Sequence, residues 1–576
     1  MATFLGHPEY RAAPNGKPLS PHASVRASDS WNLLVFRDGG RVLDGPELLR
    51  ILRQKLNNLF LISDCTLQSA REALIETLLR SGELESALAD CAGCDQAAET
   101  LAQLTSELAL ALVAKSMPRL PRTLVERLAR AEVPERLSVS TPEGFSYYAL
   151  HPLDYIDLLN EHVLGAPAAA IVGIRSIGTT LSAVVQAWFE LHGIPAERIT
   201  VRPTGHPFDR ALALTERERS WTANGIQRGA LFLVVDEGPG LSGSSFLAVA
   251  EALAQARVPP DRIILLPSSR PNLSSLLARK AADRWSRFTT IPLKPTRYIP
   301  QEAAQDIGRG EWRKVVFASE CQWPGVWTWT ERRKFLSADR YSLFRFDGHG
   351  YYGNAVRDRA QLLAEHGWGP KVLNAGDGFS ECQWITGKRP RYADRDAVLQ
   401  LARYCAFRAG HFALPSSSSA ALQQVTQVNL ERALGVSQTV ALPIERPVVA
   451  DAHMMPHEWI ATSNGRLFKV DASSHGDDHF YPGPTDTAWD LAGAITEWRL
   501  DKEASDLLID EYKRISRDSI ETRLRAYLIA YCAFRLALTT SAERSMDDAH
   551  ERTRFQRETE SYRERLVVLL SLVTAA

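Results

Sequence analysis

The segment LFLVVDEGPGLSGSSFLAVAEAL, residues 231–253, is the most informative stretch of the 576-residue chain. Its apolar run ends in two carboxylates, Asp236 and Glu237, and a turn rich in Gly, Pro and Ser leads into a helical pattern. Backbone N–H groups in such a turn and at the start of a helix point toward one spot and favour an anion there. The segment therefore predicts an anion site at the end of a buried strand.

The turn also contains the residue types that an anion site uses. Gly243 allows the backbone to approach a ligand closely, and hydroxyl donors are supplied by Ser242, Ser244 and Ser245. The neighbouring carboxylates would repel a phosphate, so they suit the hydroxyls of a sugar or a Mg²⁺ complex. A ribose that bears a 5-phosphate offers both kinds of group at this spacing.

Short apolar runs alternate with helical patterns around this segment. They include AAAIVGI (168–174), ITV (199–201) and RIILLP (262–267). This alternation predicts a parallel sheet with helices on both faces. Since ligands of such sheets bind beyond the carboxyl ends of the strands, we expect the anion site at that edge.

The order of these features resembles the type I phosphoribosyltransferases, whose signature is an acidic pair, three variable residues and a Thr-Gly-Gly-Thr-like loop. Asp236-Glu237 match the acidic pair and Ser242-Gly243-Ser244 match the loop, although Leu241 and Ser242 replace the usual Thr and Gly. The resemblance implies that phosphoribosyl pyrophosphate (PRPP) binds here with Mg²⁺. The acidic pair would then orient the ribose hydroxyls.

The same family has an earlier loop that binds pyrophosphate after the first core strand. IVGIRSIGTTLS (171–182) occupies that place, and Arg175 would neutralise the leaving group. The other donors there would be Ser176, Gly178, Thr179 and Thr180. The resemblance implies a phosphoribosyltransferase, a glycosyltransferase of nucleotide metabolism, whose partners are two small molecules: PRPP and a nucleobase-like acceptor.

A second resemblance lies in the C-terminal part of the chain. YSLFRFDGHGYYG (341–353) is an expected strand followed by a glycine-rich turn and a helical pattern, and the order resembles aminoglycoside-phosphotransferase-like kinases. The resemblance implies that Arg345 replaces the usual phosphate-binding Lys, with Asp358 as its acidic helix partner. Gly348 and Gly350 would contact the nucleotide, and ATP would be the phosphoryl donor.

Downstream segments extend this resemblance. Asp451 and His453, in VVADAHMMPHEWI (448–460), match the Asp-x-His of the catalytic loop, so that Asp451 would position a substrate hydroxyl. Glu458 is nearest to the place of the metal-binding Asn, and Asp471 stands at the metal-binding Asp. The resemblance therefore implies that Mg²⁺ is held by Asp471 and Glu458.

An alternative interpretation of the same region is a metal cluster. Four His or Asp residues follow one another closely in the loop after Asp471, and His453 could join them. Side chains of these types bind divalent ions when several of them meet. The other alternative is a solvated polar loop; the loop residues in question are His475, Asp477, Asp478 and His479.

Composition and charge exclude several classes of protein. The 67 Lys and Arg residues balance 68 Asp and Glu residues, so bulk nucleic-acid binding is not expected. No stretch approaches the roughly 18 apolar residues of a membrane span. Seven cysteines in so long a chain do not predict a disulfide framework, and the cytoplasm is the expected compartment.

The chain is therefore expected to be a multidomain α/β protein. We predict a helix-rich N-terminal domain of unknown role at 1–132, with strands at 31–36 and 59–63, a parallel-sheet phosphoribosyltransferase-like domain at 133–300, and an α+β kinase-like domain at 301–576. The leading hypothesis is a PRPP-dependent enzyme linked to a kinase-like domain that phosphorylates or binds a nucleotide. The alternatives are a non-catalytic nucleotide- or PRPP-sensing regulator and an interaction scaffold. We also expect a homo-oligomer.

Overall fold

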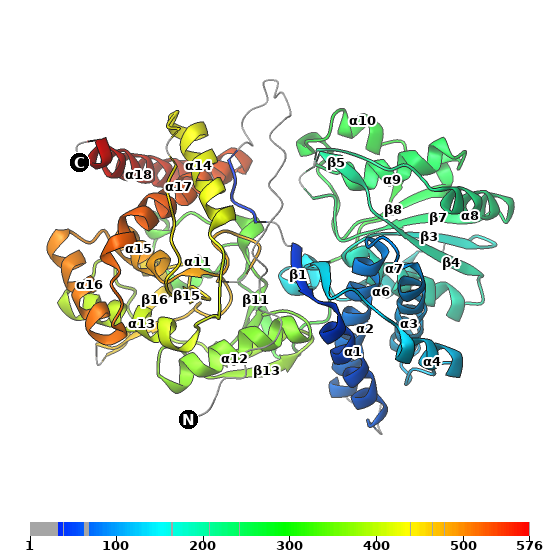
Figure 1. Cartoon of the computed structure of the whole chain (residues 1–576), viewed down its shortest axis with the longest axis horizontal. Coiled ribbons are helices and arrows are strands. Elements are labelled where there is room, and N and C mark those ends of the chain that lie inside the picture. The colour runs from blue at the N-terminus through cyan, green and yellow to red at the C-terminus, as the bar shows by residue number, and fades with distance from the viewer. Residues whose placement is uncertain are drawn as a thin grey trace.

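The computed structural model describes residues 33–37, 40–62, 68–162, 165–206, 208–240, 242–437, 439–463, 465–476 and 478–574. The chain is a mixed α/β protein that forms two lobes (Figure 1). Residues 40 to about 300 build the first lobe, and the described residues from about 301 onward, together with 33–37, build the second. The N-terminal arm, Leu241, Asp477 and the first two residues of the predicted strand at 31–36 lie outside the described residues, and residues 33–36 form only an isolated bridge at Phe36.

A five-stranded parallel sheet is the centre of the first lobe, which confirms the predicted parallel sheet. The strand order is β4-β3-β7-β8-β9. The strands are β3 (Ala169–Ile174), β4 (Ala196–Val201), β7 (Leu231–Val235), β8 (Ile263–Leu266) and β9 (Thr289–Thr290). The apolar runs of β3 and β7 are buried on both faces, as expected for strands between two helical layers.

Helices cover both faces of this sheet. Alternate side chains of each strand point to opposite faces, so they pack into two separate helical layers. Ile171 and Leu233 belong to one core, and Val172 and Val234 belong to the other. The first face is covered by α1 (Gly45–Phe60), α2 (Gln68–Ala89), α3 (Asp95–Val113), α4 (Arg122–Arg130), α6 (Asp154–Glu161) and α7 (Ile177–Leu191). The second is covered by α8 (Glu216–Gln227), α9 (Ser244–Gln255) and α10 (Ala281–Trp285).

The N-terminal helices share a single hydrophobic core with the sheet. In addition, β1 (Gly40–Asp44) pairs antiparallel with β2 (Arg136–Ser140) across the expected boundary. The division of the chain at residue 132 stays a prediction, although no separate core marks it among the described residues. The predicted strand at 59–63 is wrong, because residues 59 and 60 end helix α1.

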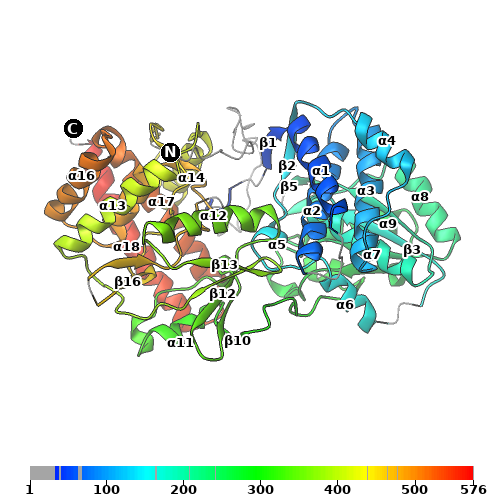
Figure 2. The same ribbon diagram turned by 90° about the horizontal axis from the view of Figure 1, so that it is seen from below.

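A five-stranded antiparallel sheet lies on one side of the second lobe, in the order β10-β11-β12-β14-β13. Its strands are β10 (Ala303–Asp306), β11 (Lys334–Ser337), β12 (Ser342–Phe346), β13 (Val372–Gly376) and β14 (Phe379–Gln383). Helix α12 (Tyr351–Glu365) follows β12. Figure 2 shows β10, β12 and β13 on one side of the lobe, with α12 beside β13.

The rest of the second lobe is mainly helical around an aromatic-rich core. Its helices are α11 (Trp312–Val316), α13 (Arg395–His411), α14 (Ala420–Leu434), α15 (Ala488–Glu497), α16 (Lys502–Ser516), α17 (Glu521–Ser545) and α18 (Ala549–Thr574). Short strands complete both lobes: β5 (Thr204–His206), β6 (Asp209–Ala211), β15 (Pro447–Val448), β16 (Trp459–Ala461), β17 (Leu467–Lys469) and β18 (Thr485–Asp486).

Polar contacts join the two lobes. Asp377 of the second lobe lies 2.6 Å from the guanidinium of Arg71 and 3.4 Å from His151 Nε2. Glu83 of the first lobe accepts a 2.7 Å hydrogen bond from the hydroxyl of Tyr351. In the part of the chain that the structure describes, no helix is both long and apolar enough to cross a membrane.

Two glycine-to-alanine changes test how α2 packs. A Cβ at Gly82 would lie 2.0 Å from Thr180 Oγ1 of α7, whereas a Cβ at Gly410 of α13 meets nothing within 4 Å. We expect Gly82→Ala to lower the free energy of unfolding by about 1–3 kcal/mol through overpacking. Gly410→Ala should raise it by up to about 1 kcal/mol through helix propensity. Urea unfolding of both variants measures the difference, and equal stabilities would contradict the packing of α2 on α7.

Candidate functional site

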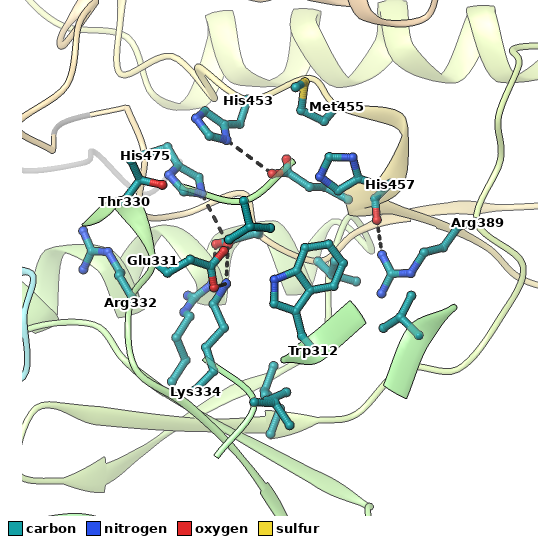
Figure 3. A pocket seen from close by; sticks show the side chains of 18 of the residues that line it. Trp312, Thr330, Glu331, Arg332, Lys334, Arg389, His453, Met455, His457 and His475 are labelled. Carbon is teal, nitrogen blue, oxygen red and sulfur yellow. Dashed lines mark hydrogen bonds and ion pairs between the residues drawn. The ribbon is translucent and has the colours of Figure 1, made fainter. Parts of the chain in front are cut away.

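A cavity of about 170 Å³ lies in the second lobe, between the antiparallel sheet and the loops that precede the long helices. Figure 3 shows its charged wall, to which several separate segments contribute. Aromatic and aliphatic side chains form the opposite wall, among them Trp312, Trp327, Met455 and Phe480. The charged residues that line it include Glu331, Lys334, Arg345, Arg389, His453, Glu458, Asp471 and His475.

Two cations on neighbouring strands point toward one carboxylate at this wall. Lys334 of β11 is the register partner of Arg345 of β12, so their side chains share one face of the sheet. Arg345 Nη1 donates to Asp471 Oδ1 at 2.7 Å, and Lys334 Nζ lies 3.6 Å from Asp471 Oδ2. Burial alone would raise the pKa of Asp471, but the nearby His475, Lys334 and Arg345 hold it well below its ordinary value.

A buried lysine connects the acidic residues of the site. Lys469, at the end of β17, donates to Glu458 Oε2 at 2.7 Å and to the backbone oxygen of Asp471 at 3.0 Å. Its Nζ also lies 3.3 Å from Asp451 Oδ1. Burial lowers the pKa of this ammonium, but Asp451 and Glu458 outweigh that effect and raise it. Sequence reasoning missed Lys469, whose signal was a lysine inside the apolar strand just before Asp471.

Asp451 lies behind the cavity wall and does not line it. Its carboxylate accepts a hydrogen bond from the hydroxyl of Tyr404, in addition to its contact with Lys469. The backbone N–H groups of Asp451 and Ala452 donate to the carboxylate of Asp490, at 2.8 and 3.0 Å. The loop is therefore held rigidly, and the role of Asp451 in positioning a hydroxyl stays a prediction.

The glycine-rich turn predicted to contact a nucleotide packs against the first lobe, and its contact with a nucleotide stays a prediction. Gly348 and Gly350 both have positive φ, but a Cβ at Gly350 would lie 2.8 Å from Glu76 Cγ of α2. A Cβ at Gly348 would lie 3.1 Å from the backbone oxygen of Ser146. The first lobe therefore covers this turn, and neither glycine lines the cavity.

The predicted pairing of Arg345 with Asp358 is wrong. Asp358 is exposed on α12, whereas the next residue, Arg359, is buried and donates to the backbone oxygen of Ser473 at 2.8 Å. Adjacent residues of a helix point about 100° apart. The buried side of α12 includes Val356, Arg359 and Leu363 but not Asp358. Arg345 pairs instead with Asp347, at 2.8 Å, and with Asp471.

In the first lobe, the predicted acidic pair lies beneath a short helix, α5 (Glu143–Ser146). Glu237 Oε2 accepts a 2.9 Å hydrogen bond from the backbone N–H of Gly144. Burial raises the pKa of Asp236 to about 7, and burial together with Glu143 raises the pKa of Glu237 well above its ordinary value. Both shifts favour the protonated, uncharged form of these carboxyl groups.

The loop after β3, expected to bind pyrophosphate, makes hydrogen bonds to other parts of the protein. Arg175 donates to Asp90 Oδ1 at 2.9 Å and to the backbone oxygen of Thr200 at 3.1 Å. Ser176, with a φ of 108°, donates its backbone N–H to Ser86 Oγ at 3.1 Å. The next residues turn inward: Gly178 packs against the backbone of β7, and Thr179 is fully buried.

The serine turn before α9 keeps the geometry that the sequence predicts, but its hydroxyls contact each other. Gly243 has a φ of 71°, in the left-handed region that favours glycine. Ser242 Oγ and Ser244 Oγ lie 2.9 Å apart, and Ser245 is half-buried in the first turn of the helix. The anion site there stays an interpretation of the local sequence.

No family model matches the sequence, and no curated protein matches it either. Among solved structures, choline kinase LicA from Streptococcus pneumoniae is similar, with 14% identity and a TM-score of 0.29. That match covers 40% of this chain and 89% of the kinase. An ethanolamine kinase from Plasmodium vivax matches at 12% identity and a TM-score of 0.28, over 42% of this chain and 78% of its own. Aminoglycoside 2'-phosphotransferase-IIIa matches at 13% identity and a TM-score of 0.29. That match covers 41% of this chain and 89% of the phosphotransferase.

These comparisons contradict the predicted function. The similar solved structures are choline, ethanolamine and aminoglycoside kinases, which transfer phosphoryl and not phosphoribosyl groups. The prediction of a PRPP-dependent glycosyltransferase with a nucleobase-like acceptor is therefore wrong, and so is the alternative of a PRPP-sensing regulator.

Removal of the buried lysine tests the charge network of the site. Lys469→Met leaves Asp451 and Glu458 without their shared counter-ion in a buried setting. We expect the free energy of unfolding to fall by about 3–5 kcal/mol, the usual cost of breaking a buried ion pair. Lys502, with a side chain 91% exposed, provides the matched control Lys502→Met, which should change it by less than about 0.5 kcal/mol. Similar losses for both variants in urea unfolding would argue against the network.

The acidic cluster under α5 predicts a dependence of stability on pH. Burial, with Asp478 nearby, raises the pKa of Glu143 from 4.5 to about 7, so the folded protein binds this proton more tightly than the unfolded chain does. The stabilisation is complete below pH 4.5 and is lost as the pH rises through about 7. Glu143→Gln should therefore raise the free energy of unfolding by about 1–3 kcal/mol above pH 7 and by little below pH 4.5.

Thermal melting of this variant across that pH range measures the effect. The exposed Glu216, with a side chain 85% accessible, gives the control Glu216→Gln. A pH-independent change in Glu143→Gln would show that folding does not shift the pKa of this carboxyl group.

Proposed function

We propose that the cavity of the second lobe binds a nucleoside triphosphate with a divalent cation and transfers its terminal phosphoryl group to a hydroxyl of a small molecule. One observation carries this proposal: two strand cations, Lys334 and Arg345, converge on the cavity carboxylate of Asp471. Phosphoryl transfer depends mainly on positioning and on electrostatic stabilisation of phosphate oxygens. A wall that combines fixed cations with a carboxylate suits that task.

The cations would bind the phosphates, and the carboxylates would hold the metal ion. Lys334 and Arg345 are set on adjacent strands and cannot move apart without breaking the sheet. Asp471 and Glu458 line the cavity and offer the oxygen donors that Mg²⁺ prefers, so the residues fit this ion by donor type. When bound, Mg²⁺ would offset the negative charge of the phosphates.

The acceptor hydroxyl would enter from the side of the apolar wall. Trp312 stacks on His457, with ring centroids 5.7 Å apart, and both side chains line the cavity (Figure 3). Asp451 would accept the proton of the hydroxyl only if Lys469 released it, because that ammonium now neutralises Asp451. The assignment of Asp451 as the proton acceptor therefore belongs to this proposal, as does the expected homo-oligomer.

Substitution of the converging charges tests the proposal. Arg345→Met and Asp471→Asn should each weaken the binding of Mg²⁺–ATP at least about 10-fold, since charge-assisted contacts to phosphate contribute about 1.5–3 kcal/mol. Asp358→Asn on the exposed face of α12 serves as the matched control and should leave binding unchanged. Calorimetric titration measures affinity, and ADP release is followed with a panel of amino alcohols and amino sugars. Absence of ATP binding by the unaltered protein would refute the proposed function.

A further inference from the structure

Three side chains meet at one side of the cavity: His453 and Glu458 from the segment before β16, and His475 from the loop after β17. One nitrogen or oxygen atom from each lies within 4.8 Å of the corresponding atoms of the other two. Ligands bound to a common ion at about 2.0–2.2 Å lie no more than roughly 4.4 Å from one another. The donor atoms therefore need to move by only a few tenths of an ångström to share an ion (Figure 3).

Main-chain contacts fix the segments that carry these three residues relative to one another. A Cβ at Gly476 would lie 1.9 Å from the backbone oxygen of Ala450, so the loop that carries His475 packs directly on the loop that carries His453. The backbone N–H of Val470 donates to the oxygen of Glu458 at 3.0 Å. The position of each donor is therefore set by main-chain contacts and does not depend on a flexible side chain alone.

The two imidazole rings lie face to face, with centroids 4.1 Å apart and planes inclined by 6°. Burial lowers the pKa of His475, but the neighbouring Asp471 and Asp478 raise it to about 10, so an ion would bind in exchange for the proton of that ring. His453 Nδ1 lies 3.3 Å from Glu458 Oε1, and the other oxygen of Glu458 is held by Lys469 at 2.7 Å. The lysine thus leaves Oε1 as the oxygen directed at the histidines.

His475 also has the outer partners that metal-binding histidines use. Its Nε2 lies 3.3 Å from Asp471 Oδ2, and its Nδ1 lies 3.7 Å from Asp478 Oδ2. Whichever nitrogen binds an ion, a carboxylate stands beside the other one. Such carboxylates orient the ring and increase the basicity of the ligating nitrogen.

We propose that His453, Glu458 and His475 bind a divalent ion of the zinc class, such as Zn²⁺ or Co²⁺. Imidazole nitrogens favour these ions, whereas Mg²⁺ prefers oxygen ligands and keeps several waters. Three protein ligands beside an open cavity leave a coordination position for water or for an anionic ligand. The site shares Glu458 with the proposed Mg²⁺ position, but it does not rest on phosphoryl transfer.

Metal titration of the full chain tests this site without any nucleotide. The protein is stripped with a chelator, and the binding of Zn²⁺ is measured by calorimetry while the visible absorption of Co²⁺ reports nitrogen ligation. We expect one ion per chain, with Mg²⁺ unable to displace it at equal concentration. His453→Gln and His475→Gln should each weaken binding by about 100-fold or more, since loss of an outer partner alone costs 10–100-fold.

His457→Gln is the matched control, because His457 lines the same cavity but does not belong to the donor set. Circular dichroism and thermal melting of each variant establish that it is folded. Weak or absent Zn²⁺ binding, or equal affinity in all three variants, would overturn the proposal. Zn²⁺ binding without any ATP turnover would leave it standing and would count against the proposed kinase activity alone.

Discussion

The buried ammonium of Lys469 holds the acidic residues of the second lobe together. Three carboxylate-bearing residues, Asp451, Glu458 and Asp471, come from different turns, and Lys469 contacts each of them through a side-chain or backbone oxygen. Without a counter-ion, the desolvation of two carboxylates would cost several kcal/mol for each ion. Lys469 is therefore the one cation that contacts all three of these residues, while Arg408 lies 3.7 Å from Asp451 and Arg345 lies 2.7 Å from Asp471.

The same constraint explains which groups face the cavity. The Asp451 carboxylate pairs with Lys469 and lies behind the cavity wall. Lys334 and Arg345 pair instead with Asp471, which lines the cavity. The first lobe adds to this arrangement through its residues around α5. Tyr148 hydrogen-bonds His479 Nε2 at 2.7 Å, so one segment contacts both the acidic pair of the parallel sheet and the loop after Asp471.

The parallel sheet could be predicted because its signal is local. Apolar runs such as 168–174 and 231–235 are long enough to require burial on both faces. The site was less predictable, because its contacts join residues far apart in the chain. Asp358 matched an expected spacing, yet the register of α12 turns Arg359 toward the core and Asp358 toward solvent. Lys469 was visible as a charge in an apolar strand, but nothing local to it identified Asp451 and Glu458 as its partners.

The loop at 236–245 shows why a correct local pattern can suggest the wrong chemistry. Its strand, acidic pair and left-handed glycine are all present in the structure. However, α5 covers the acids, Gly144 donates to Glu237, and Glu143 adds a third carboxyl group nearby. Each of these contacts comes from about 90 residues earlier in the chain. Because burial and like charge favour the protonated acids, tertiary packing changes the charge that the local sequence predicts for this pair. The chemistry of an acidic pair is therefore decided by the segment that packs over it.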